Sequence, residues 1–476
     1  MKTVHPAQPV QLQLFDLDGR DVLVVGLGLS GLAMARWAAS RGARVSVVDT
    51  RQAPEQLETL RAQLPNVPFR SAPLSGELLD GVDALLWSPG LSTEIGDSAA
   101  LHALARSRDI PVLGEIELFA QALSVLREQG YQPRVVAITG TNGKTTTTRL
   151  VGHLCQAAGI SVAVAGNIAP AALDVLREAM ESSALPSVWV LELSSFQLAV
   201  TDSLVADAAA ILNLSQDHLD WHVSMDSYLD AKQRVYRGAR VCVYNRDEPQ
   251  TMPRKPGEHS GFGDSVPKQI GDFGIVHEGG LRWLATAVAE DDAPGKRRKE
   301  PVQVMLKRLM PAEALLIRGT HNQMNVLAAL ALAQAVGVPM ARMLHGLRDF
   351  TGEEHRCQLV ATIRDVQYYD DSKGTNVGAT VAALGGLGRR CVLIAGGLGK
   401  GQDFSPLMAA VRDHAQAVLL IGRDAALLRA AIAPSGVMIE DCQSLEQAVR
   451  KAGTLAQPHD AVLLSPACAS LDMFKN

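Results

Sequence analysis

The length, composition and charge of the chain exclude several classes of protein. With 476 residues it is too long for one ordinary core, which predicts two to four domains. Apolar residues at 47% and charged residues at 20% are typical of a soluble globular protein, and a formal charge of -5 argues against nucleic-acid binding, because no net positive field attracts a polyanion.

The cysteines and the N-terminal residues indicate a reducing compartment. The six cysteines are scattered, without a C-x-x-C pair or zinc-ligand spacing, and are too few for a disulfide framework in a chain of this size. The opening MKTVHPAQPV lacks the apolar region of a signal peptide, and no run approaches the roughly 18 apolar residues of a membrane span. We therefore expect a cytoplasmic protein that does not insert into a membrane.

Three stretches of the chain each alternate predicted strands and helices. The first opens with the strand DVLVV, a glycine-rich turn and a helix over 32–40, and continues through VSVVDT and ALLWSPG. The second contains VVAITG, VWVLELSS and AAAILNLS, and the third contains QYYDDSKGTN, CVLIAGG, AVLLIGRD and AVLLSPACAS. Such alternation predicts an α/β fold with mostly parallel sheets covered by helices. We place the three domains at residues 1–114, 115–352 and 353–476.

The turn GLGLSG in the first stretch has the glycine spacing of a dinucleotide-binding fingerprint. Gly26, Gly28 and Gly31 precede a helix, and Asp49 ends the next strand. The motif supports a phosphate site at the helix N-terminus but does not distinguish NAD from another nucleotide that carries a pyrophosphate. The cluster of Asp49, Thr50 and Arg51 could contact a ribose or a base, and Ser88, Pro89 and Gly90 end a neighbouring strand.

The strongest motif is TGTNGKTTTT, between a predicted strand and a predicted helix. Gly140 and Gly143 let backbone amides surround phosphates, Lys144 neutralises their charge, and the Thr145 hydroxyl can hold Mg²⁺. Ile138 stands where the usual P-loop has its first glycine, so the motif is a shortened variant. Because a chance glycine turn rarely has this strand–loop–helix context, we predict ATP binding.

Three more residues of the second stretch are candidates for chemistry at the P-loop. Glu192 and His218 follow predicted strands, from where they could reach a metal ion, although each is also consistent with an ordinary structural residue. Lys232 shares the apolar face of a predicted helix with Tyr228 and Val235. By default its amine would extend to solvent; the alternative is an amine that is masked or modified inside the site.

Later polar residues extend this set. Asn322 and Asn325 lie one turn apart on a predicted helix, where their amides could contact a nucleotide or only cap the helix. Arg356, in the segment EEHR, could bridge two domains through ATP phosphates. Lys373 and Lys400 follow predicted strands and suit a dicarboxylate, although either alone could be a solvent-exposed lysine.

Taken together, these segments resemble the Mur ligase family from about residue 21 to the end. In chain order they are GTNGKTTTT, ELSSFQL, NLSQDHLDWH, DAKQRVY, GTHNQMN, EHR, DDSKGTN, GGLGKGQDF and LSPACASLDMFKN. The resemblance implies a Rossmann-like UDP-binding domain, a central P-loop ATPase domain and a Rossmann-like amino-acid domain. Within the family, GLGLSG, DTR, SPG, SKGTN and SPACASLD imply a ligase that joins D-glutamate to UDP-N-acetylmuramoyl-L-alanine in peptidoglycan precursor synthesis.

The resemblance also implies a mechanism. The γ-phosphoryl group of ATP passes to the L-alanine carboxylate, and the amine of D-glutamate then displaces phosphate from the acyl phosphate. Lys144 would hold the γ-phosphoryl group, with one Mg²⁺ near Thr145 and Glu192 and a second near His218. Lys232 would be carbamylated by CO₂, which converts it into an anionic metal ligand.

Every remaining candidate residue takes its role from this resemblance. The ATP set is Gly140, Thr141, Asn142, Gly143, Lys144, Thr145, Thr146, Asn322, Asn325, Arg356 and Asp371. The UDP set is Gly28, Leu29, Ser30, Asp49, Thr50, Arg51, Ser88, Pro89 and Gly90. The muramoyl-peptide set is Asn167, Ser194 and Gln197, and the glutamate set is Lys373, Thr375, Lys400, Ser470 and Leu471.

The chain departs from the family pattern at three places. Leu398 replaces an acidic residue, Ala169 replaces a glycine, and the chain stops at Asn476, where the family continues into a terminal helix. We therefore expect a C-terminal domain that is truncated at its end. We also expect a monomer whose C-terminal domain moves inward when ATP binds.

Three other functions stay open at this point. A sister ligase would add L-alanine, a diamino acid or, in the folate branch, glutamate. A nicotinamide oxidoreductase would use GLGLSG but would leave the P-loop and the inward lysine without a role. A P-loop binding module would need only the nucleotide site.

Overall fold

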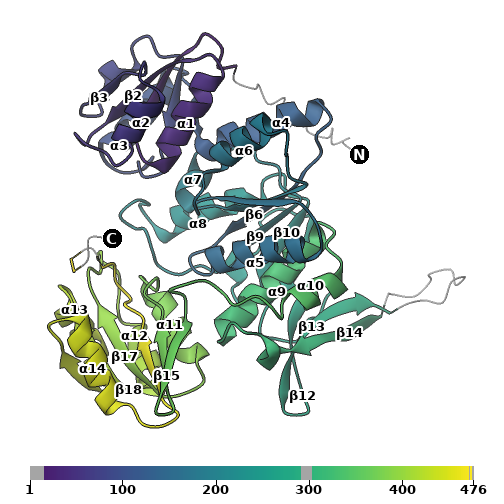
Figure 1. The fold of residues 1–476 in the computed structure, drawn as a ribbon, viewed down its shortest axis with the longest axis vertical. Helices are drawn as coiled ribbons and strands as arrows, with labels where there is room; N and C mark the ends of the chain where they lie inside the picture. The colour runs from purple at the N-terminus through teal and green to yellow at the C-terminus, as the bar shows by residue number, and fades with distance from the viewer. Residues whose placement is uncertain (1–15, 291–302, 471, 474–476) are drawn as a thin grey trace, which may run out of the picture. The chain divides into compact units, whose positions relative to one another are not determined.

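The computed structural model describes residues 16–290, 303–470 and 472–473, which form three sheets with helices packed against them (Figure 1). The chain divides into two compact units. The N-terminal unit consists of Met1–Pro133, Ala165–Pro186 and Ser195–Val205. The larger unit consists of Arg134–Val164, Ser187–Ser194 and Ala206–Asn476.

The sheet of the N-terminal unit is parallel throughout. Its order is β3-β2-β1-β4-β5, with β1 Asp21–Val25, β2 Arg44–Asp49, β3 Phe69–Ser71, β4 Ala84–Trp87 and β5 Val112–Gly114. The helices of the unit are α1 Leu29–Ser40, α2 Leu57–Gln63, η1 Gly76–Leu79, α3 Gly96–Ser107, α4 Glu115–Glu128, α6 Ala172–Glu181 and α7 Ser195–Ala199. Every residue of β4 is buried, as expected for a parallel strand covered on both faces.

The first helix begins earlier than predicted. The sequence predicts a helix over 32–40, whereas α1 starts at Leu29, directly after the extended N-cap residue Gly28. Gly31 lies inside this first turn, where an added Cβ atom would lie 2.1 Å from the carbonyl oxygen of Gly26. The third glycine of GLGLSG therefore lets the helix pack closely on β1.

The central sheet combines parallel and antiparallel strands. Its order is β14-β13-β12-β11-β10-β9-β6-β8-β7. The bounds are β6 Arg134–Thr139, β7 Val162–Gly166, β8 Val188–Glu192, β9 Ala208–Ile211, β10 Val241–Asn245, β11 Glu258–Phe262, β12 Phe273–Glu278, β13 Leu281–Ala289 and β14 Val304–Pro311. Strands β6 and β8 to β11 pair in parallel, and β12 to β14 form an antiparallel meander.

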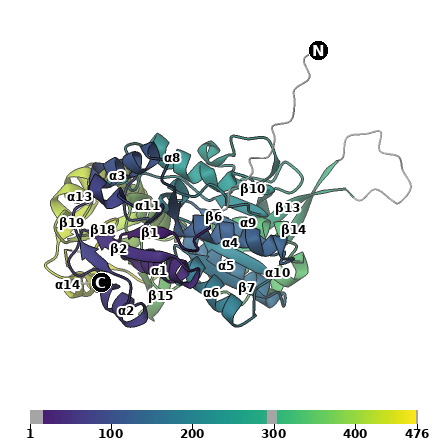
Figure 2. The same cartoon turned by 90° about the horizontal axis from the view of Figure 1, so that it is seen from above.

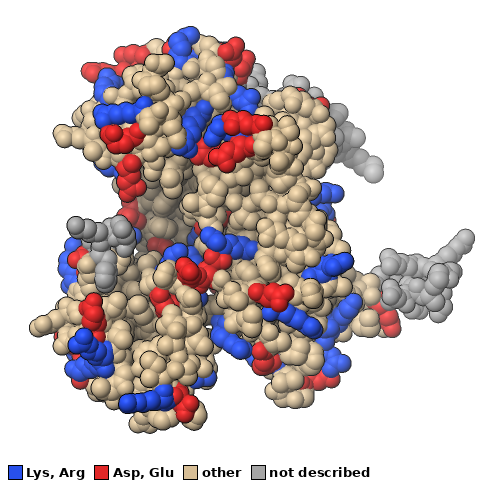
Figure 3. All heavy atoms as spheres, viewed as in Figure 1, with Lys and Arg blue, Asp and Glu red and all other residues tan. Residues whose placement is uncertain are grey.

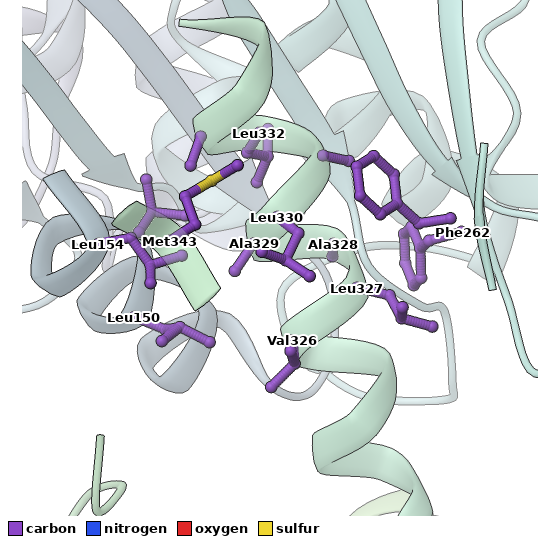
Figure 4. Packing of buried hydrophobic residues seen from close by; sticks show 14 of the residues in the cluster. Leu150, Leu154, Phe262, Val326, Leu327, Ala328, Ala329, Leu330, Leu332 and Met343 are labelled. Carbon is purple, nitrogen blue, oxygen red and sulfur yellow. The ribbon is translucent and has the colours of Figure 1, made fainter. Parts of the chain in front are cut away.

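Helices α5 Lys144–Ala157 and α9 Thr320–Ala335 pack next to the central strands, and α10 Met340–Gly346 packs against both helices (Figures 1 and 2). Figure 4 shows Leu150 and Leu154 of α5 and Met343 of α10 close to α9, with Phe262 on its other side. Residues 326–333 of α9 are all buried, because its small and aliphatic side chains meet protein on every side. The remaining helices here are α8 Met225–Gln233, η2 Arg234–Tyr236, η3 Pro249–Thr251 and η4 Ala312–Ala314.

The C-terminal sheet has the order β15-β16-β20-β17-β18-β19. Its strands are β15 Gln358–Ile363, β16 Val366–Asp370, β17 Cys391–Gly396, β18 Ala415–Ile421, β19 Met438–Asp441 and β20 Ala461–Leu464, and only β15 is antiparallel to its neighbour. The helices are α11 Val377–Gly386, α12 Leu407–His414, α13 Ala425–Ile432, η5 Ala433–Ser435 and α14 Leu445–Leu455.

Two predictions about the whole chain can be checked here. All six cysteines are free and buried, as predicted for reduced thiols. Within the described residues, no helix combines the length and the apolar character that crossing a bilayer requires.

Candidate active site

A glycine-rich turn joins β6 to α5 at the centre of the candidate site. Gly143 caps α5 with a φ of 78°, a left-handed conformation that favours glycine. A Cβ atom at Gly143 would also lie 2.3 Å from Oδ1 of Asn325, so no larger residue fits without movement. No side chain of the N-cap residue bonds to α5, which leaves the first backbone N–H groups of the helix for an anion.

Hydrogen bonds from the segment after β9 hold this turn in place. Asn213 Oδ1 accepts from the Asn142 N–H at 2.7 Å, and Asn213 Nδ2 donates to the Asn142 carbonyl at 2.9 Å. Thr141 Oγ1 accepts from the Ser215 N–H at 3.0 Å and lies 3.1 Å from the Tyr228 hydroxyl. Asn213 is not among the predicted residues. The sequence feature that could have indicated it is its amide side chain, shortly after the end of the apolar strand AAAI.

Two lysine amines meet at one carbonyl oxygen of the turn. Lys144 Nζ donates to the carbonyls of Gly140 at 3.0 Å and Thr141 at 2.8 Å. Lys232 Nζ donates to the same Gly140 carbonyl at 2.8 Å and lies 4.5 Å from the centre of the Tyr228 ring. Lys232 is 1% exposed, so the default prediction that its amine extends to solvent is wrong, and the inward alternative is correct.

Burial lowers the pKa of both amines, and more strongly that of Lys232. Burial lowers the pKa of Lys232 well below its ordinary value, the Lys144 ammonium adds to this effect, and Asp217 opposes it. Burial also lowers the pKa of Lys144, although the Glu192 carboxylate acts in the opposite direction. A buried lysine with a lowered pKa is available as a nucleophile.

Two of the predicted metal-site residues, Glu192 and His218, interact electrostatically with these lysines. Glu192 ends β8 with 3% of its surface exposed and interacts with Lys144. His218 has a φ of 56°, and its ring meets the Tyr228 ring edge-on with 6.2 Å between centroids. Burial lowers the pKa of His218, the charges of both lysines add to this effect and Asp217 opposes it, so the neutral imidazole is favoured.

No ready-made metal cage accompanies them. In the described ranges, no three side chains of His, Cys, Asp or Glu are grouped as a possible metal site. Magnesium is usually held by one or two carboxylates together with substrate phosphates, so Thr145 and Glu192 suit it without such a cage.

A cavity of about 260 Å³ adjoins the turn on the side of α9 and α11. Among the residues that line it are the predicted ATP contacts Asn142, Gly143, Thr146, Asn322, Asn325, Arg356 and Asp371, together with Lys373. Asn325 Nδ2 donates to Asn322 Oδ1 at 3.1 Å, and Asn322 Nδ2 donates to the Arg318 carbonyl at 2.7 Å. The amides therefore form a connected wall of the cavity rather than helix caps.

Arg356 reaches the P-loop from the start of the C-terminal domain. Its Nη2 donates to Thr145 Oγ1 at 2.9 Å, while its Nε is buried without a hydrogen-bond partner in the described part of the chain. Asp371 is held inside its own domain, where Oδ2 accepts from Ser465 Oγ at 2.7 Å and Oδ1 accepts from the Cys357 N–H at 3.2 Å. Burial raises the pKa of Asp371 to about 6.

A second cavity lies in the N-terminal unit. Its volume is about 520 Å³, and it is lined by all residues of the predicted UDP set, namely Gly28, Leu29, Ser30, Asp49, Thr50, Arg51, Ser88, Pro89 and Gly90. Asp49 is 3% exposed; it accepts from the Leu27 N–H at 2.7 Å and pairs with both Nε and Nη2 of Arg51. Asp49 therefore positions the turn and the guanidinium of Arg51.

Family comparisons fit this geometry. Models described as Mur ligase MurD-like, N-terminal domain, Mur ligase middle domain and Mur ligase, glutamate ligase domain match residues 20–114, 138–333 and 355–468. A protein of Ralstonia nicotianae named UDP-N-acetylmuramoylalanine--D-glutamate ligase is 56% identical over 473 residues, which cover 97% of this chain and 95% of the relative. The chain belongs to the Mur ligase family. A Paraburkholderia xenovorans protein of the same name is 55% identical, with 95% and 93% covered.

Solved structures of Mur ligases share the fold. The MurF ligase of Thermotoga maritima in complex with ADP has a TM-score of 0.52 at 15% identity and covers 95% of this chain and 92% of its own. The UDP-N-acetylmuramate-alanine ligase MurC of Thermotoga maritima has a TM-score of 0.51 at 18% identity, with 94% and 96% covered. At these identities the likeness concerns the fold, and it confirms the predicted three-domain α/β architecture. The domain limits at 114 and 352 stay predictions.

The predicted glutamate residues of this Mur ligase lie on loops at the strand ends of the C-terminal domain. Lys373 borders the cavity beside the P-loop, and Thr375 and Lys400 are exposed. Leu398 and Ala469 exchange backbone hydrogen bonds of 2.7 and 3.0 Å, which join the Lys400 loop to the segment before Ser470. The Leu398 substitution therefore leaves this backbone pairing intact. Leu471 lies outside the described residues.

The predicted muramoyl-peptide residues are divided between the two units. Asn167, after β7, and Gln197, in α7, belong to the N-terminal unit, whereas Ser194 belongs to the larger unit. Two buried glutamates that contact this part of the N-terminal unit, Glu115 and Glu117, are missing from the predicted set. Their signal is the pair of acids in GEIELF, at the start of an otherwise apolar helix.

Proposed function

We propose that this Mur ligase is an ATP-dependent amide-forming enzyme that joins D-glutamate to UDP-N-acetylmuramoyl-L-alanine, with release of ADP and phosphate, in peptidoglycan precursor synthesis. The observation that carries the proposal is the turn at Gly140, where two desolvated lysines meet at a helix N-terminus. The relatives named UDP-N-acetylmuramoylalanine--D-glutamate ligase, at 55–56% identity, support the substrate assignment.

The P-loop residues would bind and orient ATP. The free N–H groups at the start of α5 suit the phosphates, and Lys144 can exchange its two carbonyl contacts for the γ-phosphoryl group. The cavity beside Asn322 and Asn325 would take the adenosine. Magnesium, held by Thr145 and Glu192 with a second ion near His218, would neutralise the charge that develops on the phosphoryl oxygens.

Lys232 is suited to carbamylation. Because its pKa lies well below the ordinary value, the neutral amine, which can attack CO₂, is favoured; the new N–C bond forms as the nitrogen loses one proton. The product is an anion beside the Lys144 ammonium, so the Lys144 charge that disfavours a second ammonium at Lys232 would stabilise the carbamate.

The amide then forms by attack on the activated carboxylate. An oxygen of the L-alanine carboxylate takes the γ-phosphoryl group, and the D-glutamate amine attacks the resulting acyl carbon and releases phosphate. Lys373, Thr375, Lys400, Ser470 and Leu471 are the proposed contacts of D-glutamate. Asn167, Ser194 and Gln197 are the proposed contacts of the muramoyl-peptide end, and the cavity at Gly28 is the proposed UDP site.

We further propose a monomer in the cytoplasm that binds neither nucleic acid nor membrane and closes its C-terminal domain on ATP. On the face drawn in Figure 3, Lys and Arg side chains alternate with Asp and Glu side chains, which does not favour a polyanion. Small-angle scattering that is identical with and without ATP would contradict the closure.

Phosphate release from Mg-ATP tests the function. The enzyme is mixed with UDP-N-acetylmuramoyl-L-alanine and with D-glutamate, L-glutamate, L-alanine or no amino acid. We expect release with D-glutamate alone, together with a mass gain of one glutamyl residue on the nucleotide. Release with a different amino acid would identify a sister ligase, and ATP hydrolysis that is independent of the acceptor would favour a P-loop binding module.

A further inference from the structure

Two buried carboxylates at the start of α4 contact the segments that carry the muramoyl-peptide residues. Glu115 is 2% exposed and Glu117 is 5% exposed. Figure 1 shows α6 and α7 beside α4, and both contact it. In the sequence these two helices lie within the span matched by the middle-domain model, yet they pack into the N-terminal unit.

Glu115 replaces the missing cap of α6. The N-cap residue of α6, Ala171, offers no side-chain hydrogen bond. Instead, Glu115 Oε1 accepts from the Leu173 N–H at 2.9 Å, and the Ala172 N–H also bonds to this carboxylate. The start of α6 is therefore fixed by a side chain of another helix.

The same carboxylate contacts one predicted substrate residue, Gln197, and the helix that follows the loop of another. Gln197 Nε2 donates to Glu115 Oε2 over 3.5 Å, a long hydrogen bond, and Gln197 is 4% exposed. On the other side, the loop before α6 carries Asn167 and is closed by a bond from the Gly166 N–H to the Pro170 carbonyl at 3.3 Å. Glu115 thus connects the start of α6, which follows the loop of Asn167 in the sequence, with the side chain of Gln197.

Among the residues that the structure describes, Glu117 bonds to the segment after α7 and not to a predicted substrate residue. Its Oε2 accepts from the N–H groups of Asp202 at 2.7 Å and Ser203 at 2.9 Å, and its Oε1 accepts from Ser203 Oγ at 2.7 Å. All of these partners lie beyond α7. Glu117 therefore anchors the chain, whereas Glu115 alone of the two bonds to a predicted substrate residue.

We infer that Glu115 is a positioning residue for the muramoyl-peptide end of the acceptor: it sets the start of α6 and the orientation of Gln197 without touching the substrate. This inference rests on the proposed function. It predicts that changes at Glu115 affect recognition of the muramoyl-L-alanine part, while recognition of UDP and ATP is retained.

The charge state of Glu115 matters for this role. Two backbone donors and the Gln197 amide all require acceptor oxygens, which the ionised carboxylate offers on both sides. Burial raises the pKa of Glu115 to about 7, the backbone donors oppose this effect, and Asp174 of α6 adds to it. Asp174 pairs in turn with Arg36 of α1 at 2.7 Å. Protonation of Glu115 would remove one acceptor oxygen and weaken the contact with Gln197.

The test compares Glu115→Gln with Glu128→Gln, an exposed glutamate of the same helix. Calorimetry measures the binding of UDP-N-acetylmuramoyl-L-alanine and of UDP alone, and kinetics give the KM values. For Glu115→Gln we expect acceptor affinity to fall about 10-fold, as for other residues that orient a binding group, with UDP affinity and the KM for ATP unchanged. We expect no change for Glu128→Gln.

A pH series and a double-mutant cycle separate positioning from simple support of the fold. In the wild type, the acceptor KM should fall as pH rises through about 7, whereas in Glu115→Gln it should stay flat. The effects of Glu115→Gln and Gln197→Ala on acceptor binding should be less than additive, because both remove one contact. Additive effects, or an equal loss of UDP and acceptor affinity, would overturn the inference. Binding needs no turnover, so an inactive wild type that binds the acceptor would count against the proposed function alone.

Discussion

Lys232 in the larger unit and Glu115 in the N-terminal unit are both buried ionisable residues, and burial acts on them with opposite sign. Lys232 sits beside another cation, and its pKa is lowered so that a neutral amine results. Glu115 sits among backbone donors, and its pKa is raised only to about 7 because those donors stabilise the ionised form. Burial alone does not determine how far a pKa moves; the neighbouring charges and hydrogen-bond donors add to its effect or oppose it.

The largest effect is expected from removal of the P-loop cation. Lys144→Ala should lower the turnover number by about 10³-fold, since a charge aimed at the developing phosphoryl charge is lost. Steady-state kinetics would show this loss. Lys268→Ala, which changes an exposed lysine of the same unit, serves as the control and should retain full activity.

Replacement of Lys232 tests whether its amine acts through carbamylation. Lys232→Ala should lower activity by about 10²-fold, and acetate or propionate added in millimolar amounts should restore part of it by supplying a carboxylate at the vacated position. The same acids should leave the wild-type rate unchanged. A carbamylated Lys232 would be contradicted if the acids did not restore activity to Lys232→Ala and the wild type kept full activity in buffers freed of CO₂.

Glycine at the P-loop cap should be irreplaceable for two separate reasons. Gly143→Ala introduces both a left-handed alanine, at about 1–2 kcal/mol, and a collision with Asn325. Gly130→Ala is the matched variant, because Gly130 has a φ of 98° but open space around its Cβ position. Urea unfolding should show a greater loss of unfolding free energy for Gly143→Ala than for Gly130→Ala. Only Gly143→Ala should raise the KM for ATP. Equal behaviour of the two variants would mean that the contact with Asn325 is unimportant.

The smallest effect concerns stability and pH at Glu115. Its pKa is raised from 4.5 to about 7 in the folded protein, so the folded state binds the proton more tightly than the unfolded chain. Stability associated with Glu115 is therefore fully present below pH 4.5 and is lost as pH rises through about 7, by about 3 kcal/mol at most. The stability of Glu115→Gln relative to the wild type should therefore be greater at pH 8 than at pH 5. A difference in melting temperature that does not vary with pH would exclude this assignment.

Much of the fold and of the P-loop could be predicted from local pattern. Alternating apolar strands and helices predict the mostly parallel sheets, and GTNGKTTTT predicts the turn at Gly143, because these features depend on neighbours in sequence. The segments around Asn167 and Gln197 were predicted as substrate segments, but sequence did not indicate that they pack into the N-terminal unit. That arrangement depends on contacts such as Glu115 with Leu173, between residues far apart in the chain.

Side-chain direction was harder to predict than secondary structure. Periodicity predicts that Lys232 lies on an apolar helix face. Whether its amine points to solvent or to the interior depends on the Gly140 carbonyl and the Tyr228 ring, which come together only in the folded chain. The predicted role of Asp49 as a substrate contact stays a prediction, but the bonds of both its oxygens within the protein were not predicted. Such bonds are set by the closing of a turn and are not visible in residue spacing.

Transfer of an isotopic label tests the central claim, that this site activates a carboxylate by phosphorylation, most directly. UDP-N-acetylmuramoyl-L-alanine with a heavy oxygen isotope in the alanine carboxylate is converted in the presence of ATP and D-glutamate, and the released phosphate is analysed by mass spectrometry. Phosphate that carries one heavy oxygen for each amide formed is the predicted result, because the carboxylate oxygen bonded to phosphorus leaves with it. Unlabelled phosphate, with or without amide formation, would contradict the account.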